Sequence, residues 1–142
     1  MEKNCVFCKI IAGEIPATKV YEDDKVLAFL DIAPFNYGHT LVIPKIHCHC
    51  FTEIPPDTLA AMMAAAQKLA VAVMRATGAP AYNLLMNNGQ VAGQEVPHAH
   101  LHIIPRLVDD TVSFSAPQKR YDGEALTELA AKIQERLAKN AN

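Results

Sequence analysis

The chain has 142 residues, the usual size of one domain with a real hydrophobic core. Hydrophobic residues make up 51% and charged residues 20%, which is typical of a globular protein and excludes a disordered or fibrous one. The formal net charge of −2 supplies no basic field that would attract nucleic acid or an anionic membrane surface. We therefore expect neither as a partner.

The sequence also bears on the compartment. We find no apolar run that approaches the length needed to span a bilayer. The opening residues 1–16 lack the basic start, apolar core and cleavage site of a secretory signal, so a cytoplasmic location is expected. In a reducing compartment the four cysteines are expected to be free or metal-bound: Cys5, Cys8, Cys48 and Cys50.

The first half of the chain predicts one short helix and three strands. The helix lies within residues 5–16, where an apolar run is closed by Gly13 and a proline. Asp23–Asp24 has the composition of a hairpin turn between two strands. The strands are expected at Lys19–Glu22, Val26–Asp31 and Thr40–Pro44.

The second half predicts a long helix, two strands and a second helix. Residues 55–80 favour a helix of about six turns, capped by Asp57 or Thr58 and ended by Gly78. Strands are expected within 81–89 and over 98–106. The second helix, within 122–140, carries an apolar stripe: Leu126, Leu129, Ile133 and Leu137. Short connections between the strands favour an α+β fold with an antiparallel sheet over a doubly wound parallel sheet.

Three histidines alternate with apolar residues in the segment "HAHLHIIPR". In a strand, side chains at every second position point to the same face, so His98, His100 and His102 would form one row. Such a row can bind a metal ion, act by nucleophilic catalysis, or simply be a solvated strand face. The residues alone leave these alternatives open.

The segment "CVFC" is a Cys-x-x-Cys pair, which zinc sites and redox enzymes share. The redox motif is expected after a strand, and no strand precedes Cys5, so zinc is favoured. A closed zinc site needs two further ligands. The candidates are His47, Cys48, His49, Cys50 and His98.

"HAHLHII" resembles the His-φ-His-φ-His-φ-φ signature of the histidine triad (HIT) family, where φ is hydrophobic. The segments "FCKIIAGEIP", "VLAFLDIAP", "GHTLVIPK" and "NNGQVAGQEVPHAHLHIIPR" follow in the family's order. The resemblance implies one HIT-like domain over 1–142, with a triad core at 5–106 and a C-terminal helical extension at 107–142. It implies about five antiparallel strands, one long central helix and a C-terminal helix.

The resemblance also implies roles for the histidines. His100 matches the nucleophile, which attacks the α-phosphorus of a nucleotide. The carbonyl of His98 would fix the tautomer of His100, and His102 would donate to a phosphate oxygen. His39 matches a histidine beside the catalytic strand.

Nucleotide-binding residues follow from the same resemblance. Asp31 matches the carboxylate that accepts the ribose hydroxyls. Asn87, Gly93 and Gln94 match positions around the phosphate. An apolar slot for the base is implied at five residues, each of which can equally belong to the core: Phe7, Ile10, Ile15, Phe29 and Ile32.

Glu95 departs from the phosphoramidase branch, which has a hydroxyl residue there to protonate the leaving group. A carboxylate repels phosphate unless it is protonated or faces a cation. We interpret Glu95 as facing the leaving group and favouring an amine-bearing substrate.

Zinc-bearing members of the wider superfamily imply Cys5, Cys8, His47 and His98 as ligands of a structural Zn²⁺. His49 is the alternative to His47, and Cys48 and Cys50 would be bystanders.

The resulting hypothesis is a hydrolase or nucleotidyl transferase that forms a covalent nucleotidyl-histidine. Its expected substrates are purine nucleoside phosphoramidates of the adenosine 5'-monophosphoramidate type. Because members of the family are usually homodimers, the resemblance also implies a homodimer. The alternatives are a dinucleoside polyphosphate hydrolase, a nucleotide-binding regulatory module and a purely metal-binding protein.

Overall fold

The structure, a computed structural model, describes residues 2–140. Its first half contains a short helix and three strands, as the sequence predicts: α1 (Val6–Ile11), β1 (Lys19–Glu22), β2 (Val26–Leu30) and β3 (Thr40–Pro44). The side chain of Asp23 accepts the N–H groups of Lys25 and Val26, at 2.8 and 2.7 Å. This confirms the turn between β1 and β2, because such bonds replace the backbone bonds of a turn.

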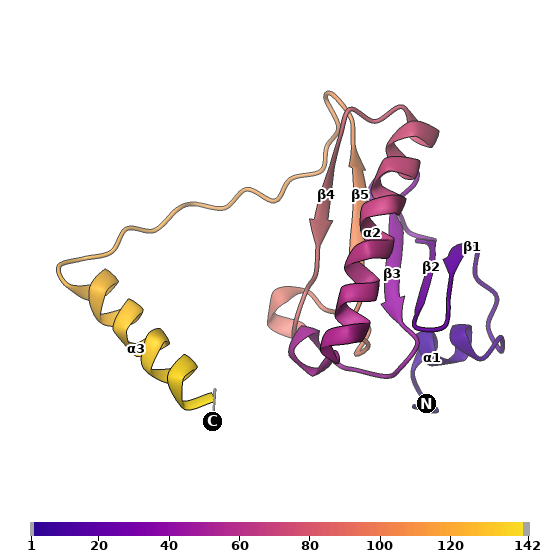
Figure 1. The fold of residues 1–142 in the computed structure, drawn as a ribbon. Coiled ribbons are helices and arrows are strands. Elements are labelled where there is room, and N and C mark those ends of the chain that lie inside the picture. Colours follow the sequence, from indigo (N-terminus) through magenta and orange to yellow (C-terminus); the bar gives the residue numbers. More distant parts are fainter. Residues whose placement is uncertain (1, 141–142) are drawn as a thin grey trace. The chain divides into compact units, whose positions relative to one another are not determined.

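The second half adds two long helices and two strands: α2 (Pro56–Thr77), β4 (Ala81–Leu85), β5 (Leu101–Arg106) and α3 (Ala125–Asn140). Two single turns of 3-10 helix, Phe51–Glu53 and Gln90–Ala92, were not expected. The five strands form one antiparallel sheet in the order β1-β2-β3-β5-β4 (Figure 1). The predicted α+β class with a long central helix is confirmed.

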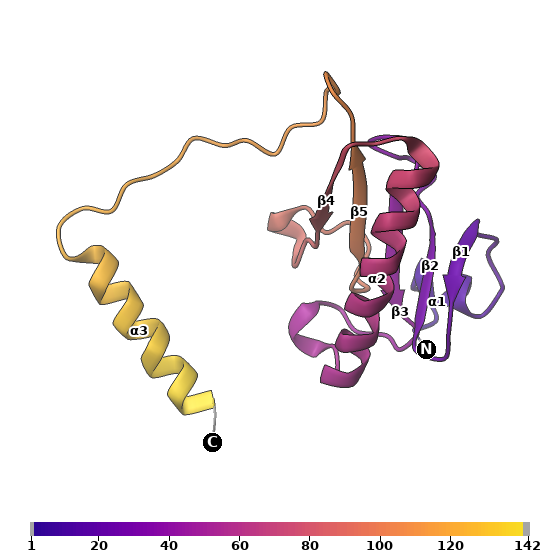
Figure 2. The same ribbon diagram turned by 45° about the horizontal axis from the view of Figure 1, so that its top comes forward.

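The two faces of the sheet have different partners. Side chains of β2, β3 and β5 alternate between the faces, as they must in a strand. Val42, Leu101 and Ile103 pack with the buried face of α2, which crosses the sheet (Figures 1 and 2). Leu41 and Ile43 point to the other face and pack with α1. His102 lies between Leu101 and Ile103 in β5, so its side chain belongs to the α1 face.

The start of α2 differs from the prediction. The helix begins at Pro56, and its N-cap residue, Pro55, makes no side-chain hydrogen bond to the first turn. Proline suits the first helical position because its missing N–H has no partner there in any case. Asp57 instead forms an ion pair with Lys25 at 2.7 Å. The end at Gly78, with φ of +72°, is as predicted.

By length and composition alone, α2 is apolar enough to cross a membrane, contrary to the expectation from the sequence. Its buried residues pack on the sheet, which is the usual position of a core helix in a globular fold. They are Met62, Ala65, Ala66, Leu69 and Ala70.

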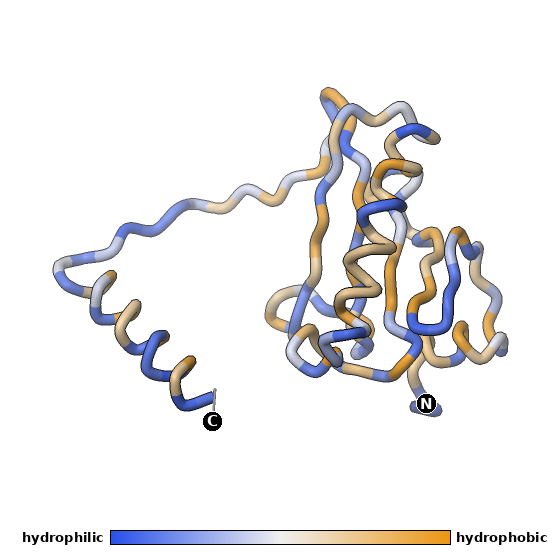
Figure 3. Tube along the Cα trace, viewed as in Figure 1, coloured by the Kyte–Doolittle hydropathy of each residue, from blue (hydrophilic) through white to orange (hydrophobic). Residues whose placement is uncertain are grey.

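The chain divides into two compact units, one ending at Val112 and the other beginning at Ser113. The expected boundary between the triad core and the extension, at residues 106 and 107, stays a prediction. In the second unit, α3 carries its predicted apolar stripe (Figure 3), and all four side chains are exposed: Leu126, Leu129, Ile133 and Leu137. That the whole of 1–142 acts as one domain stays a prediction.

Candidate active site

The triad histidines lie where an extended segment leads into β5. The prediction of one strand from residue 98 is wrong at its beginning, because β5 starts at Leu101. The N–H of Ala99 donates to the carbonyl of Cys48 at 2.7 Å and not to a neighbouring strand. His98 and His100 therefore precede the strand, and His102 is inside it.

His100 is held in one tautomer. Its Nδ1 lies 2.6 Å from the carbonyl oxygen of His98, as the resemblance implies. Because a carbonyl can only accept, Nδ1 carries the hydrogen and Nε2 keeps its lone pair. Phe7 places its ring edge-on to the His100 ring, with centroids 5.2 Å apart, and also contacts His98. The residue expected to bind the base thus supports the two histidines.

His102 and His39 form a second chain of hydrogen bonds. The N–H of Phe35 donates to His39 Nδ1 at 3.2 Å, so the hydrogen of a neutral His39 is on Nε2. His39 Nε2 lies 2.8 Å from His102 Nδ1 and must donate to it. The hydrogen of His102 is then on Nε2. This arrangement leaves His102 with a free donor while the ring is neutral.

Burial keeps these rings neutral. Desolvation, with smaller effects of His100 and His39, lowers the pKa of His102 to about 4. Burial also lowers the pKa of His39, against a smaller opposite effect of Asp31, whose Oδ2 lies 3.7 Å from His39 Nε2. Near neutral pH, donation by His102 therefore does not depend on a positive charge.

The lowered pKa of His102 gives a prediction for pH dependence. In an NMR titration of the folded protein, the His102 ring should titrate near pH 4, whereas an unfolded histidine titrates near pH 6.5. The unfolded chain then binds more protons in this window. This contribution to stability is complete above about pH 6.5 and is lost as the pH falls toward 4. A His102 midpoint near 6.5 would contradict the assignment.

Asp31, His39 and His102 also have the spacing of metal ligands, with ligand atoms within 4.8 Å of one another. The tautomers argue against a metal there, because the hydrogen between the two imidazoles occupies the position a metal would need. One oxygen of Asp31 accepts the N–H of Ala33 at 2.9 Å. Its second oxygen, Oδ2, is the one that faces His39 Nε2 at 3.7 Å.

The loop expected around the phosphate is braced internally. Gly93 has φ of +91°, and the amide of Asn87 donates to its carbonyl at 3.4 Å. The Gln94 side chain accepts from the N–H of Gly89 at 2.8 Å and donates to the carbonyl of His49 at 2.6 Å. Gln94 therefore holds the loop in place, and both ends of its amide are occupied.

The apolar residues expected to bind the base divide into two groups. Phe7, Ile10 and Phe29 are buried in the cluster between α1 and the sheet, and Ile15 packs against it. Ile32 is fully exposed and lies outside this cluster. Glu95 is also exposed. Among the residues that the structure describes, no hydrogen bond holds its carboxylate.

The four predicted zinc ligands lie together. Cys5 Sγ is 3.4 Å from His98 Nδ1, and Cys8 Sγ is 3.4 Å from His47 Nδ1. The four ligand atoms lie within 4.8 Å of one another. His98 Nε2 donates to the carbonyl of Pro44 at 2.9 Å, so its Nδ1 lone pair faces the sulfur atoms. Two sulfurs and two ring nitrogens at these distances fit a closed tetrahedral zinc site.

Two observations favour His47 over His49 as the fourth ligand. His47 belongs to the cluster, whereas His49 is exposed and pairs with Glu53 at 3.3 Å. His47 Nδ1 lies 3.4 Å from Cys8 Sγ, so the ring presents a nitrogen to the sulfur atoms. Burial lowers the pKa of His98 to about 4 and keeps that imidazole in the neutral form that binds metal.

Comparisons with known proteins identify the family of the chain. Residues 12–108 match the HIT domain family. The chain is 46% identical over 121 residues to an Arabidopsis thaliana protein named adenylylsulfatase HINT3, covering 85% of this chain but only 61% of that one. It is 40% identical over 144 residues to the Candida albicans adenosine 5'-monophosphoramidase HNT1, covering 98% of this chain and 95% of the relative.

Solved structures show the same fold. A Streptococcus mutans protein, 44% identical, superposes with a TM-score of 0.91 and covers 96% of this chain and 87% of its own. A zinc-bound histidine triad family protein from Mycobacterium smegmatis is 41% identical, with a TM-score of 0.74, and covers 94% of this chain and 97% of its own. From the sequence match, the sheet and the histidine arrangement together, the chain belongs to the HIT domain family.

Proposed function

We propose that the chain is a nucleotide hydrolase that forms a covalent nucleotidyl-histidine at His100, with purine nucleoside phosphoramidates as substrates. The observation that carries the proposal is the bond from His100 Nδ1 to the His98 carbonyl. It leaves Nε2 as a neutral nucleophile in a fixed direction. Relatives named adenosine 5'-monophosphoramidase and adenylylsulfatase support hydrolysis at a nucleotide phosphorus.

The proposed reaction has two steps. His100 Nε2 attacks the α-phosphorus and a P–N bond forms. The bond from phosphorus to the leaving amine breaks, and the amine takes up a proton from solvent. Water then attacks the same phosphorus and releases a proton to solvent, the bond to Nε2 breaks, and the nucleoside monophosphate leaves. His102 donates from Nε2 to a non-bridging oxygen, where charge accumulates in both steps. The Oδ2 atom of Asp31, which accepts no hydrogen bond from a backbone N–H of residues 2–140, accepts hydrogen bonds from the ribose hydroxyls.

Zinc has a structural role in this proposal. Four protein ligands fill a tetrahedral site and leave no open position for substrate. The ion would join α1, through Cys5 and Cys8, to the segment that carries His98. The same residue supplies the carbonyl that orients His100, so the metal would act on catalysis through position alone.

We also infer a homodimer in the cytosol. Exposed apolar side chains on the edge strand β4 and on α2 support a second copy as partner: Tyr82, Leu84, Met63 and Val71. The net charge of −2 favours neither nucleic acid nor membrane as a further partner.

A substrate panel tests the function. We expect wild-type protein to hydrolyse adenosine 5'-phosphoramidate fastest, dinucleoside polyphosphates more slowly, and to accumulate a nucleotide adduct on acid quench. If dinucleoside polyphosphates were turned over fastest, the protein would be a dinucleoside polyphosphate hydrolase and not a phosphoramidase. Tight nucleotide binding without turnover of any member would contradict the enzyme and favour a regulatory module.

The Glu95→Gln variant extends the same panel to the leaving group. If Glu95 faces a cationic amine, the variant should lose kcat/KM on lysine-like leaving groups, by about 10-fold for one lost charge contact, and little on neutral ones. Equal losses on both would remove Glu95 from the leaving-group side.

A further inference from the structure

We propose that Asn36, held by Asp110, is a positioning residue that fixes the tautomer of the His39–His102 pair. The loop from Asp31 to His39 carries two site residues, and it meets the end of β5 through Asn36. The effect on catalysis rests on the proposed function. The tautomers of His39 and His102 are a property of the protein without substrate and can be tested independently.

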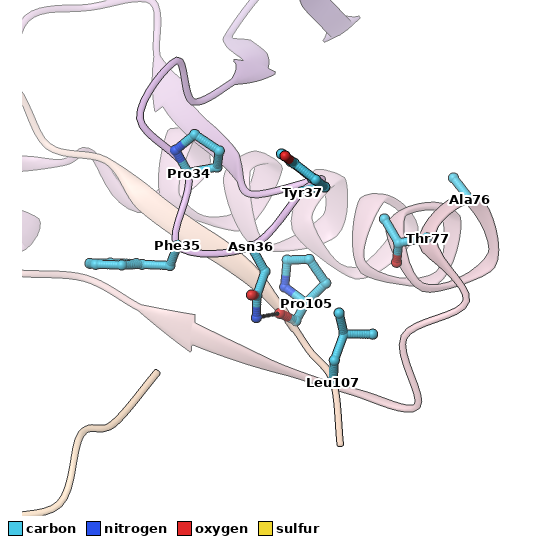
Figure 4. A pocket seen from close by; sticks show the side chains of 8 residues that line it. All are labelled: Pro34, Phe35, Asn36, Tyr37, Ala76, Thr77, Pro105 and Leu107. Atoms are coloured by element: carbon cyan, nitrogen blue, oxygen red, sulfur yellow. Dashed lines mark hydrogen bonds between the residues drawn. The ribbon is translucent and has the colours of Figure 1, made fainter. Parts of the chain in front are cut away.

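Asn36 joins the loop to the catalytic strand. Its amide donates to the Pro105 carbonyl at 2.9 Å, as Figure 4 shows, and to Asp110 Oδ2 at 3.0 Å. Its own carbonyl accepts the N–H of His39 at 3.0 Å. The neighbouring N–H, that of Phe35, is the group that donates to His39 Nδ1. The Asn36 side chain thus anchors the backbone that makes two contacts with His39, one to its ring and one to its N–H.

Asp110 makes this anchor rigid. Its carboxylate accepts two bonds from Arg106, at 2.8 and 2.9 Å, and the N–H groups of Leu107 and Val112. Only 6% of its side chain is exposed. The Arg106 guanidinium, together with these N–H groups and Asn36, holds the pKa of Asp110 far below its ordinary value. The carboxylate that accepts from Asn36 is therefore charged near neutral pH and is held in position by these bonds.

The loop is also fitted closely to α2. Gly38 has φ of +95°, and a Cβ there would lie 2.6 Å from Thr77 Cγ2. Asn36 and Thr77 line the same groove of about 620 Å³, which Figure 4 shows between the loop, α2 and the end of β5. The close approach at Gly38 is local, because the loop beside Asn36 borders this open groove, so the bonds of Asn36 to the β5 side hold that part of the loop.

The chemical consequence follows from the order of donors. If the Phe35 N–H moves away, His39 can carry its hydrogen on Nδ1 and accept at Nε2. His102 must then donate from Nδ1, and its Nε2 becomes a lone pair. Without its hydrogen, His102 Nε2 would repel a phosphate oxygen, whereas with the hydrogen it donates to that oxygen and stabilises it. Asn36 thereby determines whether His102 is a donor, although it does not touch the substrate.

The tautomers can be read directly by long-range ¹H–¹⁵N NMR of the imidazole rings. In wild-type protein we expect both His39 and His102 to carry hydrogen on Nε2. In Asn36→Ala we expect a population of each ring with hydrogen on Nδ1. Asn83→Ala is the matched control, because Asn83 accepts from Arg106 at 2.8 Å but has no bond to the loop. Unchanged tautomers in folded Asn36→Ala would overturn the proposal.

Asp110→Asn is a second variant in case Asn36→Ala does not fold, and it should shift the tautomers in the same direction. The kinetic readout is separate. We expect kcat for the phosphoramidate to fall about 10-fold in Asn36→Ala with little change in KM, a part of the loss of one full oxyanion donor. A shifted tautomer with unchanged kcat would overturn the catalytic part. Absence of turnover in wild type would refute the proposed function. The NMR result alone would then decide whether Asn36 fixes the tautomers.

Discussion

Replacing His100 by alanine is expected to abolish the covalent adduct and to lower kcat/KM for adenosine 5'-phosphoramidate by about 10⁴-fold or more. The His100 side chain supplies the nucleophilic Nε2. Among residues 2–140, its only hydrogen bond is the one from Nδ1 to the His98 carbonyl, which orients the ring. No neighbouring group can replace it, because the hydrogen on His102 Nε2 makes that atom a donor. Acid quench followed by mass spectrometry checks the adduct, and steady-state kinetics checks the rate.

His49→Ala is the matched control for this experiment. His49 is an exposed histidine whose ring pairs with Glu53, and it has no role in the proposed reaction. We expect its adduct and its rate to equal those of wild type. An adduct that persists in His100→Ala would move the nucleophile to another residue. Nucleotide affinity should change much less than kcat, since the contacts to base and ribose remain.

Removing a zinc ligand should have the largest effect on stability. Purified wild-type protein is expected to contain about one zinc per chain, and Cys8→Ala should lose it. Structural zinc binds with an apparent free energy of about 10–16 kcal/mol in zinc-finger peptides, and such binding is coupled to folding. We therefore expect the free energy of unfolding of Cys8→Ala to fall by several kcal/mol. Metal analysis and denaturant unfolding measure the two effects.

Cys50→Ala provides the comparison for the zinc experiment. Cys50 is half-buried, lies outside the cluster, and contacts the hydroxyl of Thr52 at 3.2 Å. The zinc content and the unfolding curve of Cys50→Ala should stay close to those of the wild-type protein. A folded wild-type protein without metal would contradict the structural zinc site. Instant loss of activity on chelation, with the unfolding curve unchanged, would indicate a catalytic metal instead.

The elements could be predicted from sequence because their signals are local. Turn residues followed by an apolar run mark β3, and the glycine after Thr77 marks the end of α2. The errors arose where a neighbouring residue overrides the local signal. Pro55 and Pro56 displace the expected side-chain cap of α2. The bond from Ala99 to the Cys48 carbonyl removes the first residues of the histidine segment from the sheet.

The side chains of the site could be anticipated, but the atoms that orient them could not. Motifs identified His98, His100 and the cysteine pair. The orienting groups are backbone atoms of Phe35 and Pro44, which any residue type could supply, so composition carries no signal for them. Asp110 was also missed. The spacing of Arg106 and Asp110, four residues apart after a strand, was the one signal that could have drawn attention to it.

The hydrogen bonds of the site join residues that are far apart in the sequence. Cys5 and His98 are separated by 93 positions, His39 and His102 by 63. Contacts of such separation form late, because a long stretch of chain must be ordered first. During synthesis, the site cannot close until the ribosome has released β5. Before that point the nascent chain contains Cys5, Cys8 and His47 but lacks His98, the fourth member of the cluster. The cluster of four metal-binding side chains can therefore assemble only after about two thirds of the chain has been synthesised.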